Sequence, residues 1–104
     1  LHLVPGTVDK IKTNLKLPHI GWNTLHFKTP TPLFAGVDEG AYVYFVHTYC
    51  AMVELERDVY AVTDYGGPVS AAVGRGNVYG TQFHPEKSGD VGLEILKNFV
   101  RLQG

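Results

Sequence analysis

The pattern of hydrophobic positions predicts a series of short strands followed by one helix. The strongest strand signal covers residues 41–51, where aromatic and β-branched side chains are dense. Alternation places Tyr42, Tyr44, Val46 and Thr48 on one face and Val43, Phe45, His47 and Tyr49 on the other. Because both faces are largely apolar, we expect a strand covered on both sides, as in layered α/β or α+β domains.

Weaker patterns predict further short strands around this segment. Extended stretches are expected at residues 8–11, 18–27, 52–62, 69–73 and 78–83. The last two are joined by Gly74-Arg75-Gly76-Asn77, a plausible hairpin loop, and residues 64–68 form a turn. Residues 33–40 are expected to form a turn of helix or a loop.

The final segment has the period of an amphipathic helix. Ser88 is its expected N-cap, and Asp90 lies in the first turn, where the helix dipole favours negative charge. Its expected apolar face comprises Val91, Ile95, Leu96, Phe99, Val100 and Leu102. The predicted fold class is therefore α/β, strand-rich with a C-terminal helix.

Composition narrows the class of protein. The 104 residues suffice for one globular domain at most, and the net charge of -1 provides no basic excess for nucleic acid. No apolar run approaches the roughly 20 residues that span a bilayer. The single cysteine fits a reducing, cytoplasmic setting. Because the first residue is Leu1, we expect a piece of a longer chain or a processed one.

The residues His84, Pro85 and Glu86 are the main candidate for chemistry. Pro85 fixes its own φ and biases His84 toward extended backbone, which makes a stiff elbow. A carboxylate beside a histidine can orient the ring and stabilise its protonated form, as in a catalytic triad. The competing interpretation is an ordinary hydrogen-bonded surface turn, because His-x-Glu is short and common and leaves the nucleophile unassigned.

Other candidate residues carry less weight. The five histidines, His2, His19, His26, His47 and His84, are scattered without metal-ligand spacing, so we expect no metal and no cofactor. Cys50 ends a strand that is expected to be buried, which favours a small core residue. It stays a minority candidate for the nucleophile because it is the only thiol.

Three motifs resemble a known family. Residues 80–89, Gly-Thr-Gln-Phe-His-Pro-Glu-Lys-Ser-Gly, resemble the C-terminal signature of class I (triad) glutamine amidotransferases. Within that family, Pro-His-Ile-Gly-Trp-Asn at 18–23 and Tyr-Phe-Val-His-Thr-Tyr at 44–49 resemble the glutaminase subunits of imidazole glycerol phosphate synthases. The match runs in order over nearly the whole chain, which makes it far more specific than His-Pro-Glu alone.

The resemblance implies a reaction and its residues. The family hydrolyses L-glutamine to glutamate and ammonia with a Cys-His-Glu triad, without a cofactor. His84 would act as base and then as acid, and Glu86 would orient it. The backbone around Thr48 and Tyr49 matches the segment that holds the α-groups of glutamine.

The resemblance also implies a partner. Ammonia would pass to a cyclase subunit with a (β/α)8 barrel in a heterodimer, which makes imidazole glycerol phosphate in histidine biosynthesis. Trp22, Tyr44 and Lys87 match positions at that interface, near the ammonia passage. No nucleic acid and no membrane are implied.

One motif of the family is absent from this sequence. The family's nucleophile lies in an upstream Gly-x-Cys-x-Gly elbow, which no segment here matches. We therefore expect residues 1–104 to be one partial domain, the C-terminal half of a three-layer fold. Such a half would be inactive alone and would leave an apolar face uncovered.

Two alternatives stay open. The chain could be a non-catalytic module that only binds a partner. It could also be the same half of an amidotransferase from GMP, anthranilate or pyridoxal phosphate synthesis. The Gly-Trp-Asn and Val-His-Thr-Tyr segments argue against these other pathways.

Overall fold

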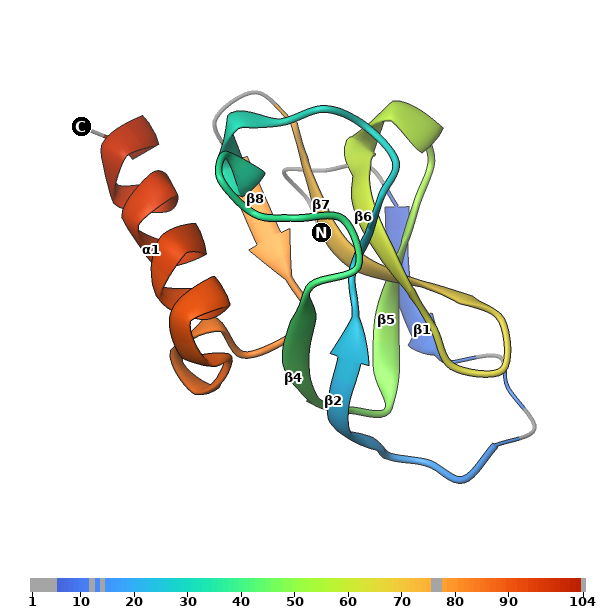
Figure 1. The fold of residues 1–104 in the computed structure, drawn as a ribbon. Coiled ribbons are helices and arrows are strands. Elements are labelled where there is room, and N and C mark those ends of the chain that lie inside the picture. The colour runs from blue at the N-terminus through green and yellow to red at the C-terminus, as the bar shows by residue number, and fades with distance from the viewer. Residues whose placement is uncertain (1–5, 12, 14, 76–77, 104) are drawn as a thin grey trace.

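Short antiparallel strands form the body of the molecule, and one helix lies along its side (Figure 1). This computed structural model describes residues 6–11, 13, 15–75 and 78–103. In the described residues β1 (Gly6–Lys10) pairs with β5 (Tyr49–Val53), and β2 (His19–Thr24) pairs with β4 (Tyr42–His47). The expected α/β class, strand-rich with a C-terminal helix, is confirmed.

A four-stranded sheet completes the described strands. Its order is β3–β6–β7–β8, and every neighbouring pair is antiparallel. The strands are β3 (His26–Phe27), β6 (Val59–Asp64), β7 (Pro68–Arg75) and β8 (Val78–Thr81). The predicted hairpin is confirmed by the pairing of Arg75 with Val78, although the centre of its loop lies outside the described residues.

The helical elements are mostly single turns. Within the described ranges, the 3-10 turns η1 (Pro32–Phe34) and η2 (Glu56–Asp58) separate strands, η3 (Pro85–Lys87) lies between β8 and the helix, and α1 (Gly89–Gln103) ends the described chain. Helix α1 packs against η1, η3 and β4. Among the described residues, no helix combines the length and apolar character that a membrane span requires.

The prediction of one strand over residues 41–51 is wrong in one respect. The chain bends at Thr48 and passes from β4 in one sheet to β5 in another. The alternation of buried and exposed positions changes at this bend. Odd-numbered Val43 and Phe45 are buried in β4, whereas the adjacent residues Cys50 and Ala51 are both buried in β5. The carbonyl of Thr48 accepts the Ile11 N–H at 2.9 Å, which ties the bend to the end of β1.

The expectation that both faces of this strand are covered also fails within the described residues. Tyr42 is 60% exposed and Val46 is 40% exposed on the face opposite Phe45. The other expectation, an apolar face left uncovered, is met by these side chains and by Ile20 and Trp22 across the strand pair.

The prediction of one strand over residues 52–62 is also wrong. Strand β5 ends at Val53, the turn η2 follows, and β6 starts at Val59. The reason is the charged run between them, which is poorly suited to a sheet interior. Its last member, Asp58, is buried and accepts a hydrogen bond from Arg75 Nη2 at 2.8 Å.

The predicted face of the helix is only partly correct. Ile95 is buried and Val91 packs against the core, but Leu96, Phe99 and Val100 are exposed. The position that the pattern missed is Asn98, which is 2% exposed. Its amide donates to the carbonyls of Leu33 and Ala35 at 2.9 and 2.8 Å, so a polar side chain docks the helix on η1.

Two buried clusters hold the fold together. The larger one lies between the four-stranded sheet, β4 and α1 and includes Leu25, Phe45, Phe83 and Ile95. The smaller one contains Ile11, Cys50 and Val69 beneath β1 and β5. Phe83, the residue before the candidate histidine, therefore belongs to the larger cluster.

Candidate active site

The backbone of the His84 elbow is held from three directions. His84 has extended dihedrals (φ -99°, ψ 100°), and Pro85 starts η3 directly after it, as its fixed φ favours. The His84 N–H donates to the carbonyl of Tyr44 at 2.9 Å, and its carbonyl accepts the Lys87 N–H at 3.0 Å. The preceding residue, Phe83, is 2% exposed and forms an isolated antiparallel β-bridge with Phe45 of β4.

Ser88 closes the elbow against β4. Its hydroxyl donates to the His84 carbonyl at 2.6 Å and accepts the Tyr44 N–H at 3.0 Å. The sequence predicted this serine as a helix N-cap. Ser88 does directly precede α1, and its carbonyl accepts the Gly92 N–H, but its hydroxyl joins strand β4 to the elbow at a position that is 2% exposed.

A close contact between α1 and η3 fixes the elbow from the other side. The backbone of Gly92 lies so near Pro85 that a Cβ at position 92 would collide with the Pro85 carbonyl oxygen. Gly92 is buried, and its N–H donates to the Ser88 carbonyl at 3.1 Å. The helix can approach the elbow this closely only because residue 92 has no side chain.

The candidate base and carboxylate contact each other. His84 Nδ1 lies 3.2 Å from Glu86 Oε2, with side-chain exposures of 39% and 61%. The backbone N–H of Glu86 lowers the pKa of its carboxyl below the usual value, and His84 and Lys87 add to this lowering. An ionised Glu86 receives the Nδ1–H, which makes Nε2 the nitrogen available to accept a proton.

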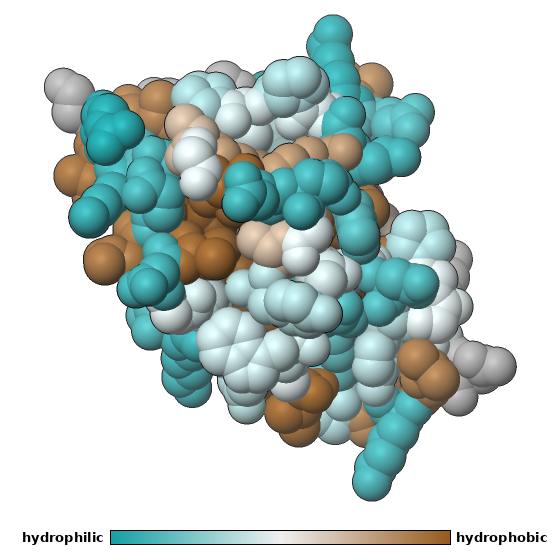
Figure 2. Space-filling model, in the orientation of Figure 1, coloured by the Kyte–Doolittle hydropathy of each residue, from teal (hydrophilic) through white to brown (hydrophobic). Residues whose placement is uncertain are grey.

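The three expected interface residues lie beside this elbow. Trp22 and Tyr44 are register partners on β2 and β4, with ring centroids 5.8 Å apart in an edge-to-face arrangement. Lys87 is exposed at the end of η3. In Figure 2 the surface over β2 and β4 is pale with scattered apolar atoms, whereas a continuous apolar area lies beside α1.

The expected substrate segment lies at the opposite end of β4. Thr48 forms the bend between β4 and β5, and the Tyr49 side chain is 57% exposed. Tyr44, which bonds the elbow, precedes Thr48 by four residues, a span of about 13 Å in an extended strand. The structure therefore bonds Tyr44 to the candidate base through the backbone, with Lys87 on the same elbow and Trp22 one strand away beside Tyr44, but it leaves Thr48 and Tyr49 at the far end of β4.

Two histidines that sequence reasoning set aside meet beneath this bend. His47 Nδ1 donates to the Tyr49 carbonyl at 3.0 Å, and His47 Nε2 lies 2.9 Å from His19 Nδ1. His19 Nε2 is 3.2 Å from Asn23 Nδ2. The contact between His19 and Asn23 could have been predicted from strand alternation, because residues four apart lie on the same face of β2.

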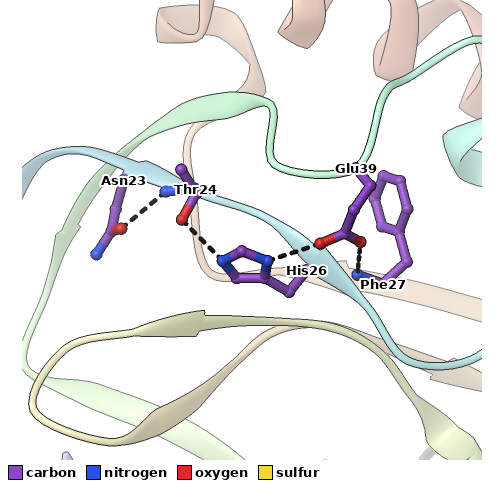
Figure 3. A network of polar contacts seen from close by, with 5 residues as sticks. All are labelled: Asn23, Thr24, His26, Phe27 and Glu39. Atoms are coloured by element: carbon purple, nitrogen blue, oxygen red, sulfur yellow. Dashed lines mark hydrogen bonds and ion pairs between the residues drawn. The ribbon is translucent and has the colours of Figure 1, made fainter.

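The polar contacts continue from Asn23 along the chain (Figure 3). Asn23 Oδ1 accepts the Thr24 N–H at 2.7 Å, and Thr24 Oγ1 lies 3.0 Å from His26 Nε2. His26 Nδ1 contacts Glu39 Oε2 at 2.6 Å, and the other Glu39 oxygen accepts the Phe27 N–H. The Phe27 N–H and then His26 lower the pKa of Glu39.

Within the described residues, Cys50 lies in a different buried cluster from the residues behind the elbow. Cys50 is 2% exposed in the smaller buried cluster, whereas Phe83 and Phe45 belong to the larger one. Within the part of the chain that the structure describes, no three His, Cys, Asp or Glu side chains are grouped to hold a metal ion. His2 lies outside that part.

Comparison with known proteins identifies the family. Residues 4–102 match the model described as Glutamine amidotransferase class-I. Proteins named imidazole glycerol phosphate synthase subunit HisH from Bacillus thuringiensis (strain Al Hakam) and Bacillus anthracis are 50% identical over 99 residues, 95% of this chain. One from Bacillus cereus (strain AH187) is 48% identical over the same length. These matches cover 47% of each relative, so the chain spans about half the length of the curated relatives it matches. The chain belongs to the class-I glutamine amidotransferases.

Proposed function

We propose that this chain supplies the acid–base half of a glutaminase site. The observation that carries the proposal is the contact between His84 Nδ1 and Glu86 Oε2 on an elbow clamped by Tyr44, Ser88 and Gly92. A histidine oriented by a carboxylate at Nδ1, with Nε2 left as the acceptor, is the part of a Cys-His-Glu triad that moves protons.

The proposed reaction needs a cysteine from a segment other than residues 1–104. His84 Nε2 takes the thiol proton, and the thiolate attacks the amide carbon of glutamine. The imidazolium then returns the proton to the departing ammonia. Water, deprotonated by the same nitrogen, hydrolyses the thioester to glutamate. Glu86 stays ionised throughout and stabilises the protonated ring.

The ammonia is proposed to pass to a cyclase subunit with a (β/α)8 barrel, in the synthesis of imidazole glycerol phosphate for histidine. The names of the relatives support this assignment. The exposed strip of Ile20, Trp22, Tyr42 and Val46 on β2 and β4 consists of aliphatic and aromatic side chains, and Tyr44 of the same strand pair bonds the elbow, which suits a subunit interface. Lys87 would contribute to that interface from η3.

Glutamate release by the complete subunit, assembled with its cyclase, tests the proposal. His84→Ala is expected to lower kcat by about 10²–10⁴, the usual contribution of general acid–base catalysis. Glu86→Gln is expected to lower kcat with little change in KM. His26→Gln is the matched control, because His26 also pairs with a glutamate but lies away from the elbow. The 104-residue chain alone is expected to be inactive, and full activity of His84→Ala would refute the assignment.

A second function, partner binding without catalysis, is favoured by the same apolar strip. In that case, Trp22→Ala would weaken assembly with the cyclase while His84→Ala would change neither assembly nor glutamate release. Measuring both variants in one binding assay and one activity assay separates the two functions.

A further inference from the structure

A directed chain of hydrogen bonds runs from Asn23 to the bend between β4 and β5. It passes through His19 and His47 and ends at the Tyr49 carbonyl. A carbonyl can only accept, so His47 must donate from Nδ1. At the other end, two hydrogen bonds fix which atom of the Asn23 amide is the nitrogen. Its Oδ1 accepts the Thr24 N–H, and its Nδ2 donates to the Asp64 carbonyl at 2.8 Å, so Nδ2 is the atom that faces His19.

These fixed ends determine the tautomer of each ring between them. His19 Nε2 must accept from the Asn23 amide, so a neutral His19 carries its proton on Nδ1. That proton is donated to His47 Nε2, which leaves Nδ1–H of His47 for the carbonyl. The chain is satisfied with both rings neutral.

Packing holds the His19 ring in this orientation. It is 3% exposed and lies between the rings of Phe45 and Tyr65, with centroids 4.7 and 4.0 Å away and nearly parallel planes. Burial, with the His47 ring as a second cause, lowers the pKa of His19 to about 4. Because the His19 ring on β2 is fixed in one orientation, its hydrogen bond to His47 fixes the His47 ring, which in turn holds the Tyr49 carbonyl next to the bend.

We propose that His47, oriented by His19 and Asn23, is a positioning residue that sets the Thr48–Tyr49 backbone for binding glutamine. This inference rests on the proposed function and on the role in holding glutamine that the family resemblance implies for Thr48 and Tyr49. Thr48 has its own carbonyl bonded to the Ile11 N–H, so the peptide groups on both sides of Tyr49 are anchored. His47 touches neither the candidate base nor its carboxylate, so its effect falls on substrate affinity rather than on proton transfer.

Two substitutions at position 47 separate positioning from simple packing. His47→Asn places an amide near the Nδ1 position and keeps the donor to the Tyr49 carbonyl. His47→Gln places its amide near the Nε2 position, so it keeps the contact with His19 but loses that donor. Both remove the ring, so a loss of packing affects both alike. Glutamine kinetics of the complete subunit with its cyclase are compared with Val100→Ala, at an exposed helix position, as control.

The expected result is asymmetric. His47→Gln raises KM for glutamine about tenfold, as the loss of one hydrogen bond predicts, with kcat within about twofold. His47→Asn keeps KM within about threefold of the unsubstituted protein. Equal effects of both variants on KM, or a lowered kcat at unchanged KM, would overturn the positioning role. Retained activity in His84→Ala would instead overturn the proposed function, so the two failures are distinguishable.

Discussion

Tyr44 and His84 are joined through their backbones, with the His84 N–H donating to the Tyr44 carbonyl at 2.9 Å. The hydroxyl of Ser88 completes the link, because it accepts from the Tyr44 N–H and donates to the His84 carbonyl. A strand that carries exposed aromatic side chains is therefore tied to the candidate base. A partner that shifted β4 would move His84 with it.

Removing the Ser88 hydroxyl tests this link. Ser88→Ala leaves the Tyr44 N–H without its acceptor at a buried position, so the free energy of unfolding is expected to fall by about 1–3 kcal/mol. Urea unfolding followed by circular dichroism measures this change. Ser70→Ala on β7 is the control, at a half-buried serine, and is expected to cost less. Equal losses at both serines would contradict the proposed link.

Gly92→Ala tests the contact between α1 and the elbow. Alanine favours a helix over glycine by about 1 kcal/mol, so propensity alone predicts a more stable protein. We expect the opposite, because the new Cβ collides with the Pro85 carbonyl and must push η3 away. Thermal unfolding is expected to shift to lower temperature, and glutaminase activity of the complete subunit to fall. Val100→Ala, at an exposed helix position, is expected to leave both nearly unchanged.

The buried His19 ring predicts how stability depends on pH. Because the folded pKa is lowered from 6.5 to about 4, the unfolded chain binds more protons between these values. The stabilisation is therefore complete above about pH 6.5 and is lost as the pH falls toward 4. One group contributes a slope of at most about 1.4 kcal/mol per pH unit.

Unfolding of His19→Gln between pH 4 and 7 checks this dependence. The groups that face the ring are His47, Tyr65 and the Asn23 amide, and none of them is a carboxylate. The variant is expected to have a flatter stability profile than the unsubstituted chain, while the exposed His26→Gln keeps the original slope above about pH 5.5, where Glu39 is ionised in the folded and unfolded chain. Identical slopes in the two variants would count against the assignment to His19.

The ion pair between Arg75 and Asp58 predicts a stability effect away from the site. Arg75→Ala leaves the Asp58 carboxylate, 5% exposed, without this partner. Loss of one partner of a fully buried pair costs about 3–5 kcal/mol, and the partial exposure of Arg75 reduces the expected loss to about 2 kcal/mol. Arg57→Ala, at the exposed neighbour of Asp58, is the control. Equal unfolding free energies of the two variants would contradict the role of the pair.

The local features of the candidate site were predictable from the sequence because they depend on neighbours along the chain. Pro85 sets the elbow, and the two-residue spacing of His84 and Glu86 lets their side chains meet. Helix α1 was also predictable from local sequence, because apolar residues such as Val91 and Ile95 recur at helical spacing. These features required no knowledge of which strands pair.

The features that escaped prediction depend on contacts between distant segments. The bend at Thr48 could not be placed, because residues 41–51 are uniformly strand-forming and the break arises from pairing with two different strands. Asn98 was missed because a buried amide is recognisable only once the Leu33 and Ala35 carbonyls are in reach. The contact between His19 and His47 likewise exists only through the register of β2 with β4.

The contact between Gly92 and Pro85 also bears on how such a chain can diverge. Any amino-acid substitution at position 92 adds at least a methyl group where the Pro85 carbonyl oxygen lies, so selection is expected to keep this residue a glycine. The outward helix positions Leu93, Leu96 and Val100 are exposed and can drift under the demands of whatever surface meets them. Across descendants of this chain, the start of the helix would therefore stay fixed relative to the histidine while its outer face changes.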